Sequence, residues 1–406
     1  MSGPTFFYAA IGAELHSHVI DTDGASLTRT GSISLPCGVQ YAWPHPSLPI
    51  VYVVCSDGGP GRNGNQHVAL ALEIDASDGT LRELGSTRRL PHRPIHCTVH
   101  PSGRYLISAY NQPSSLGVHA IDADGQLGEA IEQDALDTGI YAHQVIVTAS
   151  GASVLLVTRG NDASDARAED PGALKVYDFD QGRLRDRASL APGDGRGYGF
   201  GPRHLDLDPA GRFVYVSVER QNQLQVWPLD GEQLGERPAH VISSLDDSAD
   251  PVGGHPNSSA GLPTQQLASA IHVHPRDPGL VYQANRTARL RRDGGWPVAR
   301  DGGQDNLAVY RIDPESGRPQ VLQHIASGSI HVRTFSLHPD GRLLIAATIE
   351  PIPVGSAATG IELVPAALLL YRVADDGRLE LRRRYDVDTG GELMFWTGML
   401  TLPAGR

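Results

Sequence analysis

The chain has 406 residues, with 46 Asp and Glu against 34 Lys and Arg, and a formal net charge of −12. This acidic balance argues against the basic face with which proteins bind nucleic acid or anionic lipid. The sequence has no apolar run long enough to span a membrane, no basic segment leading into an apolar one at its start, and only three cysteines, without metal-ligand spacing. We therefore expect a cytoplasmic protein with no nucleic-acid or membrane partner.

Short runs rich in Val, Ile and Tyr recur along the whole chain. Val51–Val54 and Phe213–Val216 are examples, and Gly, Pro, Asp or Asn residues bound such runs, as is typical of β-strands. No long stretch has the 3.6-residue apolar period of a helix. The pattern predicts an all-β protein.

One half of an internal repeat is a turn of the form x-Pro-x-Gly-Arg, followed by an apolar strand. Three clear copies start at His100, Asp208 and His338. Weaker copies lie at His45-Pro46, at Ala149-Ser150-Gly151 and at His274-Pro275. The chain ends on a further copy, Pro403-Ala404-Gly405-Arg406, which has no strand after it.

The other half of the repeat is a strand that runs into an Asp-Gly type of hairpin, in which glycine supplies the positive φ of a tight turn. There are seven such hairpins, with their glycines at Gly24, Gly79, Gly125, Gly182, Gly231, Gly317 and Gly377. Seven units of this size match the four-stranded blades of a propeller, so we expect an all-β, seven-bladed β-propeller.

The two ends of the chain complement each other. The terminal turn lacks its strand, whereas Phe6–Ala10 is a strand without its turn. We therefore expect one blade to be closed by strands from both termini, with Phe6–Ala10 as an outer strand. Residues 1–406 then form a single propeller domain, with loop insertions at about 161–172, 240–266 and 287–304 that are either functional lids or disordered.

Equivalent positions of the repeat point to a common site, because the first strand of each blade lines the central channel. Six residues before the turn proline (or Ala149) lie Gln40, Ile95, His143, Arg203, Ser269, Arg333 and Thr397. Ten residues after it lie Ser56, Asn111, Arg159, Glu219, Asn285 and Ile349. Buried charge without partners is costly, so we take His143, Arg203, Glu219 and either Arg286 or Arg333 as candidates for a site at the channel mouth. A plain Arg203–Glu219 ion pair and a hydrogen-bonded core histidine at His143 are the structural alternatives.

Metal and nucleotide motifs are weak. The pairs His16/His18 and His272/His274 could share a strand face, but no HExxH motif or Cys/His set accompanies them. The glycine-rich run Gly197–Gly201 leads into a strand and not into a helix, which argues against a dinucleotide loop. We expect neither a metal nor a cofactor.

Three segments carry a resemblance to a known family. They are Gly201-Pro202-Arg203-His204 with Glu219 downstream, Tyr141-Ala142-His143-Gln144, and Ala284-Asn285-Arg286. From about Phe6 to Pro403 the chain resembles the lactonase family of seven-bladed propellers, which includes bacterial 6-phosphogluconolactonase and the fungal carboxymuconate lactonizing enzyme. The resemblance implies a catalytic set of His143, Arg203, Glu219 and Arg286. Beside it we place Arg333, Asn111, His204 and Asn285 as expected substrate-binding residues.

The expected function is a metal-independent lactonase, a hydrolase that opens a sugar-acid or carboxylated lactone in carbohydrate metabolism or aromatic degradation. His143 would act as general base, Arg203 and Arg286 would bind the oxyanion or the substrate's charge, and Glu219 would hold Arg203 or carry a second proton. The alternatives are a carboxymuconate-type lactonizing cycloisomerase and a non-enzymatic propeller scaffold. The expected partner is a small anionic lactone or carboxylate, bound by a monomer or small homo-oligomer.

Overall fold

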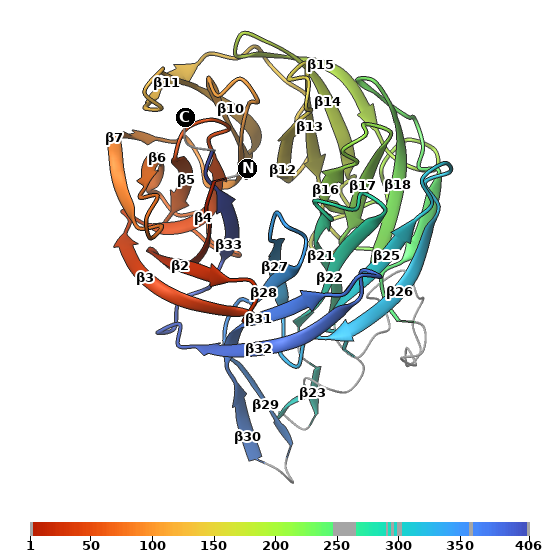
Figure 1. Ribbon diagram of the computed structural model, residues 1–406. Helices are drawn as coiled ribbons and strands as arrows, with labels where there is room; N and C mark the ends of the chain where they lie inside the picture. Colours follow the sequence, from red (N-terminus) through yellow and green to blue (C-terminus); the bar gives the residue numbers. More distant parts are fainter. Residues whose placement is uncertain are drawn as a thin grey trace. The chain divides into compact units, whose positions relative to one another are not determined.

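Every regular element that the structure describes is a β-strand. The computed structural model describes residues 3–246, 265–289, 291–293, 296–298, 303–356 and 360–403. Within these ranges no helix is long and apolar enough to cross a membrane. Figure 1 shows the strands. They fall into two compact units. Unit 1 comprises Met1–Asp21, Leu27–Tyr198 and Phe395–Arg406, and unit 2 comprises Thr22–Ser26 and Gly199–Met394.

Unit 1 contains four antiparallel sheets of four strands each among its described residues. The first consists of β33 (Trp396–Thr401), β1 (Thr5–Ile11), β2 (Glu14–Asp21) and β3 (Ser26–Ser34). The second consists of β4 (Gly38–Pro44), β5 (Ile50–Ser56), β6 (His67–Ile74) and β7 (Leu81–Arg89), and the third of β8 (Pro94–Val99), β9 (Tyr105–Asn111), β10 (Ser114–Ile121) and β11 (Leu127–Ile131). The fourth consists of β12 (Ala142–Val147), β13 (Ser153–Thr158), β14 (Ala173–Asp180) and β15 (Arg183–Leu190).

Unit 2 contains three larger sheets and two ribbons among its described residues. The first sheet has β16 (Pro202–Leu207), β17 (Phe213–Val218) and β18 (Gln223–Asp230), with β19 (Gln233–Leu234) and β20 (His240–Ser243) both paired to β18. The second has β21 (Gln265–Val273), β22 (Leu280–Arg289), β25 (Asn306–Ile312) and β26 (Pro319–Ala326), and the third has β27 (Val332–Leu337), β28 (Leu343–Thr348), β31 (Ala366–Val373) and β32 (Leu379–Val387). The ribbons pair β23 (Arg291–Asp293) with β24 (Trp296–Val298), and β29 (Ile352–Ser356) with β30 (Gly360–Val364).

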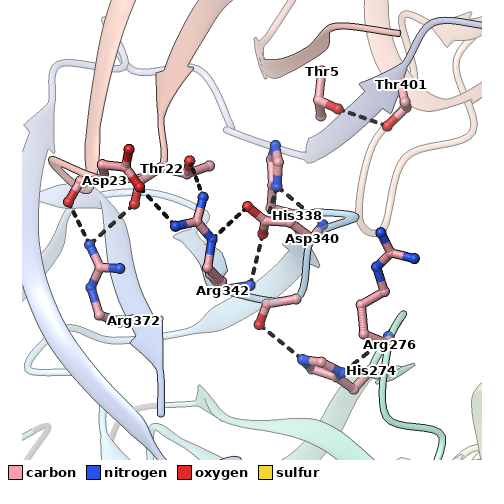
Figure 2. Close-up of polar contacts among 11 residues, drawn as sticks. Thr5, Thr22, Asp23, His274, Arg276, His338, Asp340, Arg342, Arg372 and Thr401 are labelled. Atoms are coloured by element: carbon pink, nitrogen blue, oxygen red, sulfur yellow. Dashed lines mark hydrogen bonds and ion pairs between the residues drawn. The ribbon is translucent and has the colours of Figure 1, made fainter. Parts of the chain in front are cut away.

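The first sheet of unit 1 joins the two ends of the chain. Strand β1 pairs with β33 from Thr5↔Thr401 to Ala10↔Trp396, and the Thr5 and Thr401 hydroxyls lie 3.0 Å apart (Figure 2). This pairing confirms the predicted closure of one sheet by both termini. The prediction that Phe6–Ala10 is an outer strand is wrong, because β1 lies between β33 and β2 and is buried from Phe6 onward. A strand that is apolar on both faces belongs inside a sheet.

The His-Pro turns of the repeat hold neighbouring sheets together. In unit 2, His274 Nε2 lies 2.9 Å from the Gly341 carbonyl oxygen of the next such turn (Figure 2). Gly341 has a φ of 79°, and a Cβ there would come within 2.4 Å of the His274 ring. In unit 1 the same contact links His45 Nε2 to Gly103 O at 3.1 Å and His100 Nε2 to Gly151 O at 2.9 Å. These histidines therefore have structural roles.

Two arginines of unit 2 form hydrogen bonds with the segment Thr22–Ser26 of the same unit. Arg342 donates to Asp23 Oδ1 at 2.8 Å and to Thr22 Oγ1 at 3.0 Å, and its Nε contacts Asp340 at 3.0 Å (Figure 2). Arg372 donates to the Asp23 carbonyl at 2.7 Å. The arginine of the repeated turn thus ties a second chain segment to its own sheet.

Strands occupy parts of two of the three predicted insertions. The range 240–266 begins with strand β20 and ends in β21, and residues 247–264 lie outside the described residues. The range 287–304 includes the end of β22 and the ribbon β23–β24, and its residues 290, 294–295 and 299–302 lie outside the described residues. Segment 161–172 connects β13 to β14 as a loop with isolated bridges. The sequence reading missed the ribbon β29–β30.

Candidate functional site

Three of the candidate residues share one local backbone feature, a β-bulge near the start of the first strand of a sheet. The pairing of β16 with β17 shifts between Pro202 and His204, so Arg203 is the extra residue. The same shift leaves His143 as the extra residue of β12 and Arg333 as that of β27. A bulge re-aims the side chain that it carries, and bulges are common next to active sites. The count of six residues back from the turn proline (or Ala149) had therefore selected the bulge residue of each of these three strands.

In unit 2 three of the predicted residues form one buried cluster. Arg203 Nε lies 3.2 Å from Glu219 Oε1, and Arg286 Nη2 contacts the same carboxylate oxygen. Arg203, Glu219 and Arg286 are 2%, 3% and 4% exposed. A single carboxylate thus faces two buried guanidinium groups, one from its own sheet and one from the next. The cluster lies in a site from which water is largely excluded.

Ser269 extends this cluster toward Arg333. Arg203 Nη1 donates to Ser269 Oγ at 3.4 Å, and Ser269 Oγ donates to the backbone carbonyl of Arg333 at 2.9 Å. Ser269 lies in the irregular part of β21, at the position equivalent to Arg203 and Arg333. The first strands of the three sheets of unit 2 therefore meet at these three residues.

The sequence reading missed His331 and Asp305, which lie beside the cluster. Asp305 accepts hydrogen bonds from the backbone nitrogens of Thr287 at 2.9 Å and of His331 at 2.5 Å, and from the Thr287 hydroxyl at 2.5 Å. Burial raises the pKa of the Asp305 carboxyl, although these hydrogen bonds and the charge of Arg286 act in the opposite direction. Asp305 also lines a pocket of about 450 Å³ together with Asn306 and Ser329.

His331 is held as a neutral imidazole. Burial lowers its pKa well below the ordinary 6.5, and the charges of Arg286 and Arg333 lower it further. Its backbone is left-handed, with a φ of 64°, which is uncommon for a residue other than glycine. Strained residues of this kind cluster at functional sites. A neutral imidazole beside cationic groups is able to accept or donate a hydrogen bond without adding charge.

His143 lies in unit 1. It is 7% exposed, and its ring stacks on the ring of Tyr141 with the centroids 6.5 Å apart. Tyr141 also has a left-handed backbone, with a φ of 62°, and the guanidinium carbon of Arg159 lies 5.6 Å from its ring centroid. Tyr141 precedes the bulge residue His143 by two positions, as His331 precedes Arg333. The same strained position therefore flanks the candidate residues in both units.

The predicted substrate-binding residues differ in their surroundings. Asn285 is fully buried, and its amide donates to Ser244 O at 2.6 Å and to Asn306 Oδ1 at 2.8 Å, and accepts from Ser244 Oγ at 2.7 Å. These contacts give Asn285 a structural role, and its substrate role stays a prediction. Asn111 ends β9 in unit 1, and His204 follows Arg203 in β16; both are buried. Their substrate roles also stay predictions.

No group of three His, Cys, Asp or Glu residues able to hold a metal ion occurs among the described residues. His274 is engaged with the Gly341 carbonyl, and His272 Nδ1 lies 3.6 Å from Asp206 Oδ2. The histidine pair that the sequence offered thus has other partners. The candidate residues described above offer guanidinium, carboxylate and imidazole groups.

A family model described as "Lactonase, 7-bladed beta-propeller" matches residues 7–350. The 6-phosphogluconolactonase of Erwinia tasmaniensis is 24% identical over 380 residues, which cover 93% of this chain and 93% of that protein. The 6-phosphogluconolactonase of Pectobacterium carotovorum subsp. carotovorum is 28% identical over 337 residues, 82% of each chain.

Solved structures resemble the chain over nearly its whole length. The Pseudomonas aeruginosa periplasmic gluconolactonase PpgL has a TM-score of 0.70 at 19% identity and covers 98% of this chain and 99% of its own. A protein from Lactobacillus plantarum has a TM-score of 0.65 at 17% identity, with 99% and 100% covered. At such identities the likeness concerns the fold alone. With the family match, it confirms the predicted all-β, seven-bladed propeller class.

Proposed function

Because the chain belongs to the lactonase family of seven-bladed β-propellers, we propose that it is a lactone hydrolase whose substrate is a small, anionic sugar-acid or carboxylated lactone. The observation that carries this proposal is the buried cluster in which Glu219 faces both Arg203 and Arg286. The names of the curated relatives support the same class of reaction.

Opening a lactone requires an attack by water on the ring carbonyl, after which negative charge develops on the carbonyl oxygen. Guanidinium groups that are already fixed and desolvated stabilise such a charge more than water does. Arg203 and Arg286 are both buried and both oriented by the Glu219 carboxylate. In this proposal the two arginines bind the oxyanion or the substrate carboxylate, and Glu219 positions them.

The general base is His143, as the resemblance to the family implies. An imidazole is suited to taking a proton from water near neutral pH. His143 lies on a bulge of β12 and stacks on Tyr141, which restricts the orientation of its ring. The neutral His331 is a second imidazole, but its strongly lowered pKa makes it a weaker base.

The charge of the cluster supports an anionic substrate. Two guanidinium groups share one carboxylate, and the charge of Arg333 acts on the same neighbour, His331, as does that of Arg286. An anionic substrate would form charge-assisted hydrogen bonds with such guanidinium groups. We further propose that no metal takes part. We also propose that the protein acts in the cytoplasm, whereas the fold relative PpgL is a periplasmic protein.

The test is a substrate panel. Purified protein is incubated with neutral and anionic lactones and, in parallel, with carboxylated muconates. A pH-stat titration follows hydrolysis as the release of protons and cyclisation as the uptake of protons. Hydrolysis of at least one anionic lactone, with loss of about 10²-fold or more in kcat/KM for His143→Ala, is the expected result. Cyclisation of a muconate without hydrolysis of any lactone would overturn the proposal in favour of the cycloisomerase, and inactivity in both arms would favour the scaffold.

A further inference from the structure

A buried arginine of unit 1 lacks the acidic partner that such a residue normally has. Arg93 directly precedes β8 and is 6% exposed. Its Nε donates to Gln40 Oε1 at 3.0 Å, and its guanidinium carbon lies 5.7 Å from the centroid of the Phe395 ring. None of the ion pairs between described residues includes Arg93. By contrast, buried Arg203 has Glu219 within 3.2 Å.

The positive charge of Arg93 persists despite this environment. Burial lowers the pKa of its guanidinium, whereas the Tyr141 hydroxyl acts in the opposite direction. A guanidinium nevertheless remains protonated in proteins, and burying it without a counter-charge is costly. When such a residue lies at the wall of a cavity, an anion that binds there supplies the missing counter-charge.

Arg93 lines a pocket of about 750 Å³ in unit 1. The side chains around this pocket include Arg89, His92 and His67, together with the amides of Asn65 and Gln112. No Asp or Glu is among the lining residues. The pocket therefore presents two guanidinium groups and two imidazoles to whatever enters it.

The Asp57 carboxylate accepts hydrogen bonds from the backbone beside this pocket. Asp57 Oδ1 accepts hydrogen bonds from the backbone nitrogens of Asn65 and Gln66, both at 2.8 Å. Burial lowers the pKa of His67; Asp57 acts against this effect, and the charges of His92 and Arg93 add to it. His67 Nδ1 lies 2.9 Å from Ser56 Oγ, so its ring is held in place.

We infer that this pocket binds a compact oxyanion, a phosphate or carboxylate group, with Arg93 as its principal ligand. A guanidinium offers a planar fork of donors that matches either group. Nε of Arg93 is used by Gln40, so its two terminal nitrogens are the donors left for the anion. Arg89 stands at the same pocket as a second cation, and the His92 imidazole lines it as well.

Arg93 and His143 share a neighbour within unit 1, Tyr141. Tyr141 interacts electrostatically with Arg93 through its hydroxyl, and its ring stacks on the His143 ring. If the proposed lactonase function is correct, the bound anion is the charged substituent of a lactone whose ring lies at His143. This assignment rests on the proposed function, whereas the anion site does not.

The site is tested by isothermal titration of wild-type protein, Arg93→Gln and Arg82→Gln with inorganic phosphate and with malonate. Arg82 is a matched control, because it is an exposed arginine of β7 in the same unit, paired with Glu73. We expect binding to weaken about tenfold or more in Arg93→Gln and to be unchanged in Arg82→Gln. If phosphate binds more tightly than malonate, the natural ligand carries a phosphoester. If malonate binds more tightly, the natural ligand carries a carboxylate. Equal affinities in all three proteins, or no binding to wild type, would overturn the inference.

Melting temperatures without anion separate a ligand from a structural role. Since Arg93 is a buried charge without an acidic partner, Arg93→Gln should melt at the wild-type temperature or above it. The inference would be overturned if Arg93→Gln melts at a lower temperature, Arg93→Lys restores the wild-type melting temperature, and neither substitution changes the anion affinity. Arg93 would then have a structural role.

The substrate assignment is tested with a pair of lactones that differ only in a charged substituent. Arg93→Gln should raise KM for the charged lactone and leave KM for the neutral one unchanged. An equal rise for both lactones would overturn the assignment to the substrate. If wild-type protein hydrolyses neither lactone, the proposed function fails, and the titration above still decides whether the anion site exists.

Discussion

Glu219, which directly follows β17, contacts Arg286 in β22, so one buried carboxylate joins two neighbouring sheets of unit 2. The same oxygen lies 3.2 Å from Arg203 Nε. An isolated ion pair within one sheet would have been sufficient for structure. The bridge between sheets fixes two guanidinium groups beside each other, an arrangement whose mutual repulsion an anionic ligand relieves.

Removing the charge of Glu219 should destabilise the protein. Glu219→Gln leaves two buried guanidinium groups facing each other, and breaking a buried ion pair in this way typically costs about 3 kcal/mol or more of unfolding free energy. Urea denaturation measures the effect. Glu73→Gln is the control, because Glu73 pairs with an exposed arginine and should cost at most about 1 kcal/mol. Equal effects of the two substitutions would show that Glu219 does not hold the cluster together.

The glycine of the repeated turn should be intolerant of a side chain where a neighbouring histidine packs on it. Gly341→Ala combines a left-handed φ with a clash against His274. In Gly211→Ala the φ is similarly positive, at 69°, but no atom lies within 4 Å of the new Cβ. We expect Gly341→Ala to lower the melting temperature more than Gly211→Ala does. The reverse order would contradict the role given to the His-Pro turns.

The lowered pKa of His331 predicts a loss of stability in acid. In the unfolded chain this imidazole takes a proton near pH 6.5, whereas in the folded protein it does so only at a lower pH. Its contribution is therefore present above about pH 6.5 and is lost as the pH falls from there toward the folded pKa. Urea midpoints measured at about pH 7.5 and pH 5.5 should fall less for His331→Asn than for wild type. Asparagine is chosen because it tolerates the left-handed backbone. Parallel losses in both proteins would contradict the assignment.

Activity should not depend on a metal ion. The described residues contain no cluster of potential metal ligands, and the proposed chemistry uses only side chains. Hydrolysis rates after exhaustive treatment with EDTA and dialysis should equal those of untreated protein. Loss of turnover that Mg²⁺, Ca²⁺ or Zn²⁺ restores would show that the proposed mechanism lacks a participant.

The repeats made the sheets predictable because turn chemistry is local. Each Asp-Gly hairpin and each Pro-x-Gly turn marks a connection between adjacent strands, and Gly341 is an example of a residue whose positive φ the sequence indicates. The ribbon β29–β30 was missed, since its strands contain Pro353 and Gly355, residues that weaken a strand pattern. The continuous apolar run of β1 was itself a sign of a central strand, and the prediction of an outer strand overlooked it.

For the candidate site, counting six residues back from each turn proline (or Ala149) found the bulge residues. It missed further residues that lie two positions before them. The positions two residues before Arg333 and His143, just outside β27 and β12, also deserved inspection. That count gives His331 and Tyr141, and in the second turn copy it gives Arg93. The contact of Arg286 with Glu219, by contrast, depends on how two sheets pack, which no local pattern reveals.

The central claim is that the buried arginine cluster stabilises the charge that develops when a lactone opens. The direct measurement is kcat/KM for the hydrolysis of an anionic lactone by wild type, Arg203→Lys and the control Arg82→Lys, with circular dichroism spectra to verify folding. Lysine keeps the charge but loses the planar fork of donors. We predict a loss of about 10²-fold or more for Arg203→Lys and none for Arg82→Lys. A folded Arg203→Lys variant with wild-type kcat/KM would contradict the account.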